Sequence, residues 1–200
     1  MSLNVQHVLR GYHGTNEENA ISILQHGFRP GREDCWVGSA IYFWESDRAL
    51  ALKWCEQKGF IPPVILVSQI EHSPRLLDLA TKDGTDAYQE FIRRYKTDQR
   101  CIQQLTEWIQ VNGDRFCDIY FIQLMFKTGV ISGVRFTAMA HDEMLQNKPR
   151  TFVYARKEQE KYKSRFVINV RIVLALKDST LITSTHRCNN DSKKADGRSP

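Results

Sequence analysis

The sequence contains few cysteines, and none of them stands in a metal-binding arrangement. The five cysteines are scattered along the chain, no two form a CxxC pair, and no His/Cys cluster has the spacing of a zinc site. Scattered thiols of this kind are typical of small buried side chains in a reducing cytosol. We therefore expect neither a disulfide scaffold nor a bound metal.

Long apolar runs are also absent. The longest, 167–176, is interrupted by Asn169 and Arg171 and falls far short of the about 20 residues that cross a bilayer. The first residues show no positively charged segment that leads into an apolar one, so no secretory signal is indicated. These absences predict a cytoplasmic protein with no membrane partner.

The charge of the chain is positive but unevenly placed. With 42% hydrophobic and 26% charged residues the sequence is that of a globular protein rather than a disordered one. Residues 183–200 are almost free of apolar side chains and hold four basic and two acidic residues, which leaves +3 of the formal +5 for the rest. We therefore predict one domain over 1–182 and a disordered polar tail over 183–200. The remaining charge only slightly favours a nucleic-acid partner.

Helix and strand patterns alternate without a regular βαβ repeat. Strands are predicted at 8–12 and 40–44, separated by a helix that starts with a capping box at Thr15 and stops at Gly27. Ser46 is the expected cap of the next helix. A helical middle and a β-rich end complete the chain, which predicts an α+β fold with strand groups at both ends.

Three uncharged or weakly basic residues carry most of the chemical information. His13 ends the first strand, and Tyr42 lies in an aromatic strand one helix later. Gly14 has no side chain, so its backbone can approach a ligand closely. A flat ring held by that backbone could stack on Tyr42.

This ordered set resembles the ADP-ribosyltransferase superfamily, on the poly(ADP-ribose)-polymerase-like branch that carries a His on the first strand and a Tyr on a later one. The likeness is strongest to small bacterial toxin and defence members. The resemblance implies a split β-sheet core with flanking helices. Its specific part covers residues 11–55 and consists of His13-Gly14-Thr15, Gly27-Phe28, the run from Gly38 to Trp44, and then Ala49, Ala51 and Trp54.

The resemblance implies an enzyme that binds NAD⁺, breaks the bond between nicotinamide and ribose, and moves ADP-ribose to a macromolecule. Cleavage of that bond passes through an oxocarbenium-like sugar that the enzyme must orient and stabilise. By the family pattern His13 binds a ribose hydroxyl, the Gly14 backbone pairs with the nicotinamide amide, and Tyr42 stacks on the ring. Thr15 and Ser39 are expected to line the pocket, and Arg29 to meet the pyrophosphate.

The pattern breaks at the third family position, where active relatives place a Glu or Gln on a late strand. Here that position is Val173, which cannot hydrogen-bond a hydroxyl or stabilise a cation. The acid then comes from Glu158 and Glu160, which form a Glu-x-Glu pair, or from Glu143. Alternatively the chain is an inactive module that binds NAD⁺ or ADP-ribose.

Two partners follow from the resemblance. The acceptor is a macromolecule, with nucleic acid, RNA in particular, slightly favoured over protein by the basic balance. Because a free NAD⁺-consuming enzyme would poison its own cell, an antitoxin or immunity protein is expected to restrain it. An RNA 2′-phosphotransferase, on a related fold, is a weaker alternative.

Overall fold

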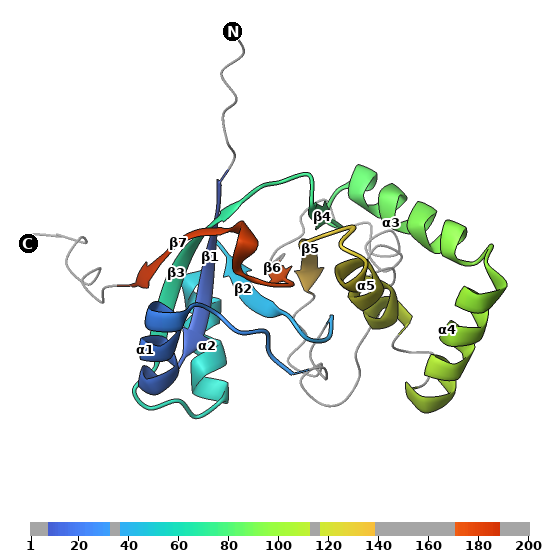
Figure 1. The fold of residues 1–200 in the computed structure, drawn as a ribbon. Helices are drawn as coiled ribbons and strands as arrows, with labels where there is room; N and C mark the ends of the chain where they lie inside the picture. Colours follow the sequence, from blue (N-terminus) through green and yellow to red (C-terminus); the bar gives the residue numbers. More distant parts are fainter. Residues whose placement is uncertain (1–7, 33–36, 113–116, 139–170, 189–200) are drawn as a thin grey trace, which may run out of the picture.

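The fold is built on a single mixed sheet, which the computed structural model shows as a curled ribbon of strands (Figure 1). The structure describes residues 8–32, 37–112, 117–138 and 171–188. The elements run in the order β1 (Val8–Thr15), α1 (Glu17–His26), β2 (Ile41–Glu45), α2 (Arg48–Gln57), β3 (Val64–Glu71), β4 (Leu76–Asp78), α3 (Lys82–Tyr95), α4 (Gln99–Asn112), α5 (Cys117–Lys127), β5 (Gly133–Ala138), β6 (Arg171–Leu176), a 3₁₀ turn (Ser179–Leu181) and β7 (Ile182–Arg187).

The sheet has the strand order β4-β5-β6-β2-β1-β3-β7 and is antiparallel except for the β4–β5 pair. The pairing between β1 and β2, in the middle of the sheet, is short. Strands β1 and β2 share two registered pairs, Gly11 with Glu45 and Tyr12 with Trp44, whereas β1 pairs with β3 over its full length. The sheet therefore consists of two groups, β4-β5-β6-β2 and β1-β3-β7, that are joined over two residue pairs. The mixed architecture agrees with the predicted α+β class.

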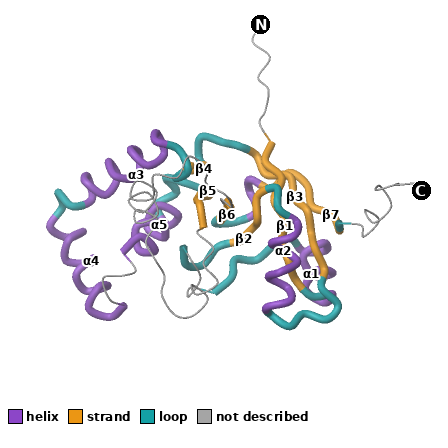
Figure 2. The backbone as a smooth tube through the Cα atoms, turned by 180° about the vertical axis from the view of Figure 1, so that it is seen from behind, coloured by secondary structure: helices purple, strands orange, loops and turns teal. Residues whose placement is uncertain are grey.

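Helices cover both faces of this sheet. Val64 and Leu66 of β3 pack with Ala20 of α1, whereas Ile65 between them packs with Ala51 of α2. Because side chains alternate between the faces of a strand, α1 and α2 lie on opposite faces. Figures 1 and 2 show α1 and α2 beside the β1-β3-β7 group, and α3, α4 and α5 at the other end of the sheet.

The main core lies between the sheet and the helical middle of the chain. It combines side chains of β2, β5 and β6 with those of α3, α4 and α5, among them the fully buried Tyr88, Ile122 and Phe136. A smaller core on the other face contains Phe43 and Leu174, and Phe28 packs against it from the loop after α1. Both faces of β2 are therefore covered, and its alternate residues belong to the two cores.

The predicted helix ends are partly wrong. Thr15 does not cap α1, because it remains in β1 opposite Val64, and the side chain of Asn16 accepts from the Asn19 N–H instead. Gly27 ends α1 as predicted, with φ 81° and its N–H bound to the Ile23 oxygen. In α2 the cap is Asp47 rather than Ser46.

The predicted boundary between domain and tail is also wrong. Residues 183–187, assigned to a disordered tail, belong to β7, which pairs with β3 from Leu66 to Ile70. The polar sequence of this segment is compatible with a strand because β7 lies at the edge of the sheet, where outward side chains meet solvent. Cys188, which follows β7, donates its N–H to the Ile65 oxygen, and residues 189–200 of the predicted tail lie outside the described residues.

Candidate functional site

His13 lies on β1 at the point where this strand separates from β2. Its Nδ1 atom is 2.9 Å from the main-chain oxygen of Tyr42. A carbonyl oxygen only accepts hydrogen bonds, so Nδ1 carries the proton and Nε2 of the neutral ring keeps its lone pair. No described residue donates a hydrogen bond to this Nε2. The imidazole therefore offers one acceptor to a hydroxyl group.

The surroundings of His13 favour its neutral form. Burial lowers the pKa of His13 below its usual value, and the hydrogen bond to Tyr42 only partly opposes this effect. The ring packs against two aromatic rings, with centroid distances of 5.2 Å to Phe28 and 5.8 Å to Phe43. At neutral pH His13 is thus an uncharged ring that donates Nδ1–H to the chain and keeps the lone pair on Nε2.

The peptide groups of β1 next to His13 also bear on the site, because some of them face β2 beyond the last registered pair of the two strands. The Ser46 N–H donates to the Arg10 oxygen, so the peptide groups of Arg10 face β2. Peptide groups alternate between the two edges along a strand, so those of Gly14, four residues further, face the same way. The β1–β2 register ends at Tyr12 and Trp44. The N–H and C=O of Gly14 therefore point toward β2, beyond the last registered pair of the two strands.

The reason for a glycine at position 14 lies on the other side of the strand. A Cβ atom there would collide with the carbonyl oxygen of Ala51 and lie 2.7 Å from the Cys55 sulfur. Helix α2 thus packs directly on the backbone of β1. We predicted a glycine that lets a ligand approach the backbone. In the structure a glycine is required here because α2 packs against β1, and the Gly14 peptide groups still point toward β2.

Tyr42 holds the loop that leads into its own strand. Its hydroxyl donates to the Gly38 oxygen at 2.6 Å and accepts from the Val37 N–H at 3.0 Å. The side-chain amide of Gln123, on α5, donates to the oxygens of Val37 and Ser39. The loop at 37–39 is therefore fixed from two sides, and the Tyr42 ring is fixed with it.

The side chains of His13 and Tyr42 do not lie on one face of the sheet. The His13 ring contacts Phe43, which precedes Trp44 and follows Tyr42 on β2. Because neighbours on a strand project from opposite faces, Tyr42 points away from His13, into the main core beside Trp44. The structure thus brings His13 to the backbone of Tyr42 rather than to its ring.

The other predicted binding residues lie in three different settings. Thr15 is buried at the end of β1, and its main-chain oxygen accepts from the Cys55 sulfur at 3.6 Å. Ser39 donates its hydroxyl to the Gly31 oxygen at 2.9 Å. Arg29 is exposed in the loop after α1, directly after Phe28. Of these three side chains, that of Arg29 is the most open to a ligand phosphate.

The position at which the resembling family carries its acidic residue is occupied here by a buried core residue, Val173. Val173 is 1% exposed and lies in β6 between Trp44 of β2 and Phe136 of β5. Glu158 and Glu160, and also Glu143, lie outside the described residues. No carboxylate is therefore supplied to the site at Val173.

Sequence reasoning missed a compact ionic network on the face of Phe43. The Arg135 guanidinium binds both oxygens of Glu45, at 2.6 and 3.1 Å, and both oxygens of Asp78, at 3.1 and 2.9 Å. All three side chains are at most 17% exposed. Burial lowers the pKa of Arg135, but the two carboxylates outweigh burial and raise it overall. The network ties β2, β4 and β5 together, and Glu45 after the aromatic run was the only sequence signal for it.

The described parts of the chain contain no group of three or more His, Cys, Asp or Glu side chains that could hold a metal ion. Within the same ranges no helix is long and apolar enough to span a bilayer.

Comparison of the chain with models of known protein families, with curated proteins and with solved structures gives no match. The family resemblance therefore remains a prediction from the residues that carry it.

Proposed function

We propose that this chain is an NAD⁺-dependent ADP-ribosyltransferase whose site lies where β1 and β2 separate. One observation supports this most directly: His13 donates Nδ1–H to the Tyr42 oxygen and so keeps Nε2 as an acceptor, next to the Gly14 peptide groups that lie beyond the last registered pair of β1 with β2. A ribose hydroxyl needs an acceptor, and a carboxamide needs one acceptor and one donor. The two neighbouring residues supply these groups in one short stretch of strand.

In the proposed reaction the bond between the nicotinamide nitrogen and the ribose C1′ breaks, and nicotinamide leaves with the electron pair. The ribose acquires oxocarbenium character, an acceptor oxygen or nitrogen forms a new bond to C1′, and its proton passes to solvent. His13 orients the ribose through Nε2, and Gly14 holds the carboxamide through its backbone. Arg29, which is exposed in the loop after α1, is the proposed partner of the pyrophosphate.

A second function is favoured by one observation. Because Val173 is buried between strands, the chain lacks a carboxylate at the position where relatives stabilise the sugar cation. A chain that binds NAD⁺ or ADP-ribose without turnover would need no such group. Glu158 and Glu160 stay the proposed source of the acid in the active alternative.

The test is release of nicotinamide from labelled NAD⁺ by the purified chain. The variant His13→Asn places an amide donor near Nδ1 and removes the Nε2 acceptor, so we expect at least a tenfold loss of release. His72→Ala, which removes an exposed histidine from the β3–β4 loop, is the matched control. Binding of NAD⁺ without any release by the unaltered chain would favour the inactive module, and no binding at all would reject both.

The acceptor and the restraining partner remain part of the proposal. Labelled NAD⁺ offered with separate pools of RNA, DNA and protein should label nucleic acid first, and label confined to protein would reject this preference. Expression of the unaltered chain should slow growth, and an antitoxin partner should restore it. Growth unaffected by an active chain would contradict the toxin assignment.

A further inference from the structure

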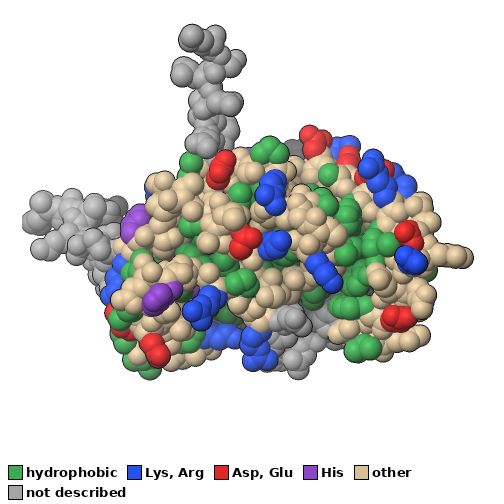
Figure 3. Space-filling model, in the orientation of Figure 1, with side chains coloured by type: hydrophobic (Ala, Val, Ile, Leu, Met, Phe, Trp, Pro, Cys, Tyr) green, Lys and Arg blue, Asp and Glu red, His purple; other side chains and the backbone are tan. Residues whose placement is uncertain are grey.

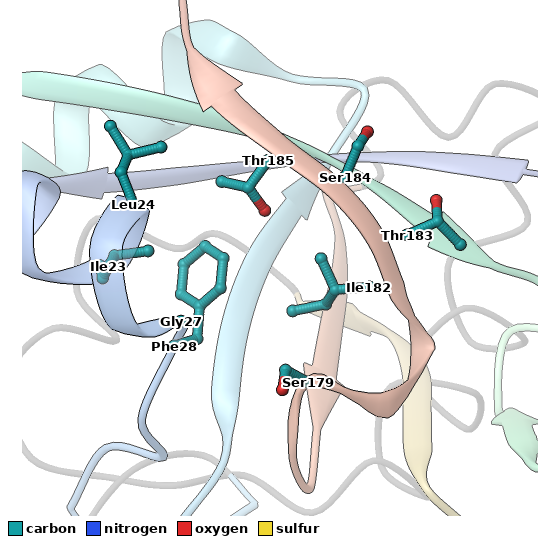
Figure 4. A pocket seen from close by; sticks show the side chains of 9 residues that line it. All are labelled: Ile23, Leu24, Gly27, Phe28, Ser179, Ile182, Thr183, Ser184 and Thr185. Carbon is teal, nitrogen blue, oxygen red and sulfur yellow. The ribbon is translucent and has the colours of Figure 1, made fainter.

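A pocket of about 280 Å³ opens on the face of the sheet that carries His13. It lies between the end of α1 and strand β7, and Figure 4 shows the side chains that line it. One side is apolar: Ile23 and Leu24 come from α1, Phe28 from the following loop, and Ile182 from the start of β7. Figure 4 shows the Phe28 ring standing between α1 and Ile182. The pocket thus offers an aromatic ring and aliphatic groups to a flat ligand.

The opposite side of the pocket is polar and uncharged. It is formed by Ser179 and by three consecutive β7 residues, Thr183, Ser184 and Thr185. The Ser179 hydroxyl makes no hydrogen bond to other described residues, whereas Thr185 pairs with Ser68 and Thr183 donates to the Gln69 oxygen at 3.3 Å. Ser184 pairs with Gln69, next to Thr185, so its side chain projects from the other face of the strand. Strand β7 is also the last strand of the sheet, so among the described strands only β3 pairs with it. Hydroxyls and strand edge together can both donate and accept.

None of the described residues that line the pocket carries an ionisable side chain. A charged group would lose its hydration here without a counter-charge, which is unfavourable. The volume is at the lower limit of ordinary ligand sites, so it holds a single small ring system and not a dinucleotide. The preferred ligand is therefore a flat, uncharged ring with apolar faces and a hydrogen-bonding edge.

We infer that this pocket binds a nucleobase. The two faces of a base are apolar and stack on aromatic side chains, while its edge carries both donors and acceptors. The Phe28 ring fits the faces, and Ser179, Thr185 and the β7 backbone fit the edge. The sugar and phosphate then stay outside, where Arg29 follows Phe28 in the chain and Lys177 precedes Ser179 by two residues. Figure 3 shows Lys and Arg side chains recurring across the middle of this face, with fewer acidic ones among them.

The pocket and the candidate site share one residue. The Phe28 ring contacts His13 edge to face and also lines the pocket. A base in the pocket is therefore one side chain away from His13, and it can come from the adenine of NAD⁺ or from an acceptor strand. Base binding itself does not depend on the transfer reaction, so the two proposals can fail separately.

The test is titration of the full chain with adenosine, guanosine, cytidine and uridine, with ribose as a control. Binding is monitored through the chemical shifts of the backbone amides. We expect shifts at β7 and at the end of α1 with a nucleoside and none with ribose. In Leu24→Glu a charge enters the apolar side, and nucleoside affinity should fall about five- to 100-fold. Ile21→Glu is the matched control, because Ile21 lies on the same helix, is 45% exposed against 44% for Leu24, and does not line the pocket.

A second variant, Phe28→Leu, keeps an apolar side chain and removes the stacking ring, so it should weaken nucleoside binding while circular dichroism stays unchanged. Failure of every nucleoside to shift these residues in the folded chain would overturn the proposal, as would equal loss in the Leu24→Glu and Ile21→Glu variants. Competition between adenosine and NAD⁺ would identify the base as that of the co-substrate. Simultaneous binding of NAD⁺ and a nucleoside or short single-stranded oligonucleotide would identify it as that of the acceptor.

Discussion

The Nδ1 atom of His13 lies 2.9 Å from the main-chain oxygen of Tyr42, just beyond the last registered pair of strands β1 and β2. This bond determines which ring nitrogen carries the proton, and so which one is left for a ligand. It also bridges the two strand groups at the place where their register has ended. A single residue thus links the chemistry of the site to the geometry of the sheet.

The first prediction concerns the pH dependence that this histidine causes. Because burial lowers the pKa of His13 in the folded chain, the unfolded chain binds more protons than the folded one below about pH 6.5. The contribution of His13 to the free energy of unfolding is therefore present above that pH and is lost as the pH falls toward the folded pKa. Urea unfolding between pH 5 and 8 measures it, and His13→Asn should reduce the slope. An unchanged slope in this variant would contradict the assigned burial effect.

The second prediction separates the ring of Tyr42 from its hydroxyl. Tyr42→Phe removes both hydrogen bonds to the 37–39 loop, which should cost about 1–2 kcal/mol of stability. If the ring stacks on nicotinamide, Tyr42→Phe should retain nicotinamide release within a few-fold and Tyr42→Ala should lose it. Equal loss in both variants, each checked for folding, would show that the loop rather than the ring matters.

The third prediction compares two ion pairs of different burial. Arg135→Met leaves the largely buried carboxylates of Glu45 and Asp78 without this partner, and should lower the free energy of unfolding by about 3–5 kcal/mol. Arg187→Met removes the pair with Glu17, in which both side chains are 44% exposed, and should cost less than about 1 kcal/mol. Urea unfolding of both variants gives the comparison. Similar losses of unfolding free energy in the two variants would mean that the Arg135 network stabilises the fold no more than a surface ion pair.

The fourth prediction concerns the end of the chain. A chain that stops at Ile182 lacks β7 and exposes the edge of β3, where Leu66 and Ile70 belong to the cores. It should melt at a clearly lower temperature than a chain that stops at Cys188, whose N–H still bonds to the Ile65 oxygen. Equal melting temperatures would show that β7 does not stabilise the sheet.

Some local features were predictable because they depend on neighbouring residues. The stop of α1 at Gly27 follows from the ease with which glycine adopts a positive φ, and it is confirmed at 81°. The start of α1 was misplaced by one residue, because pairing of Thr15 with Val64 keeps it in the strand. A long-range partner there overrode a correct local rule.

The sequence by itself determined the α+β mixture, the alternation of apolar side chains on β2, and the candidate residues His13, Gly14 and Tyr42. Only the tertiary structure decided that His13 meets the backbone of Tyr42 and that Val173 is enclosed between two strands. It also decided that the polar segment after Ile182 is a strand, because β3 supplies the hydrogen bonds that its own composition does not predict. Residues far apart in the chain make these contacts, and a local pattern contains no information on which distant strand will pair with it.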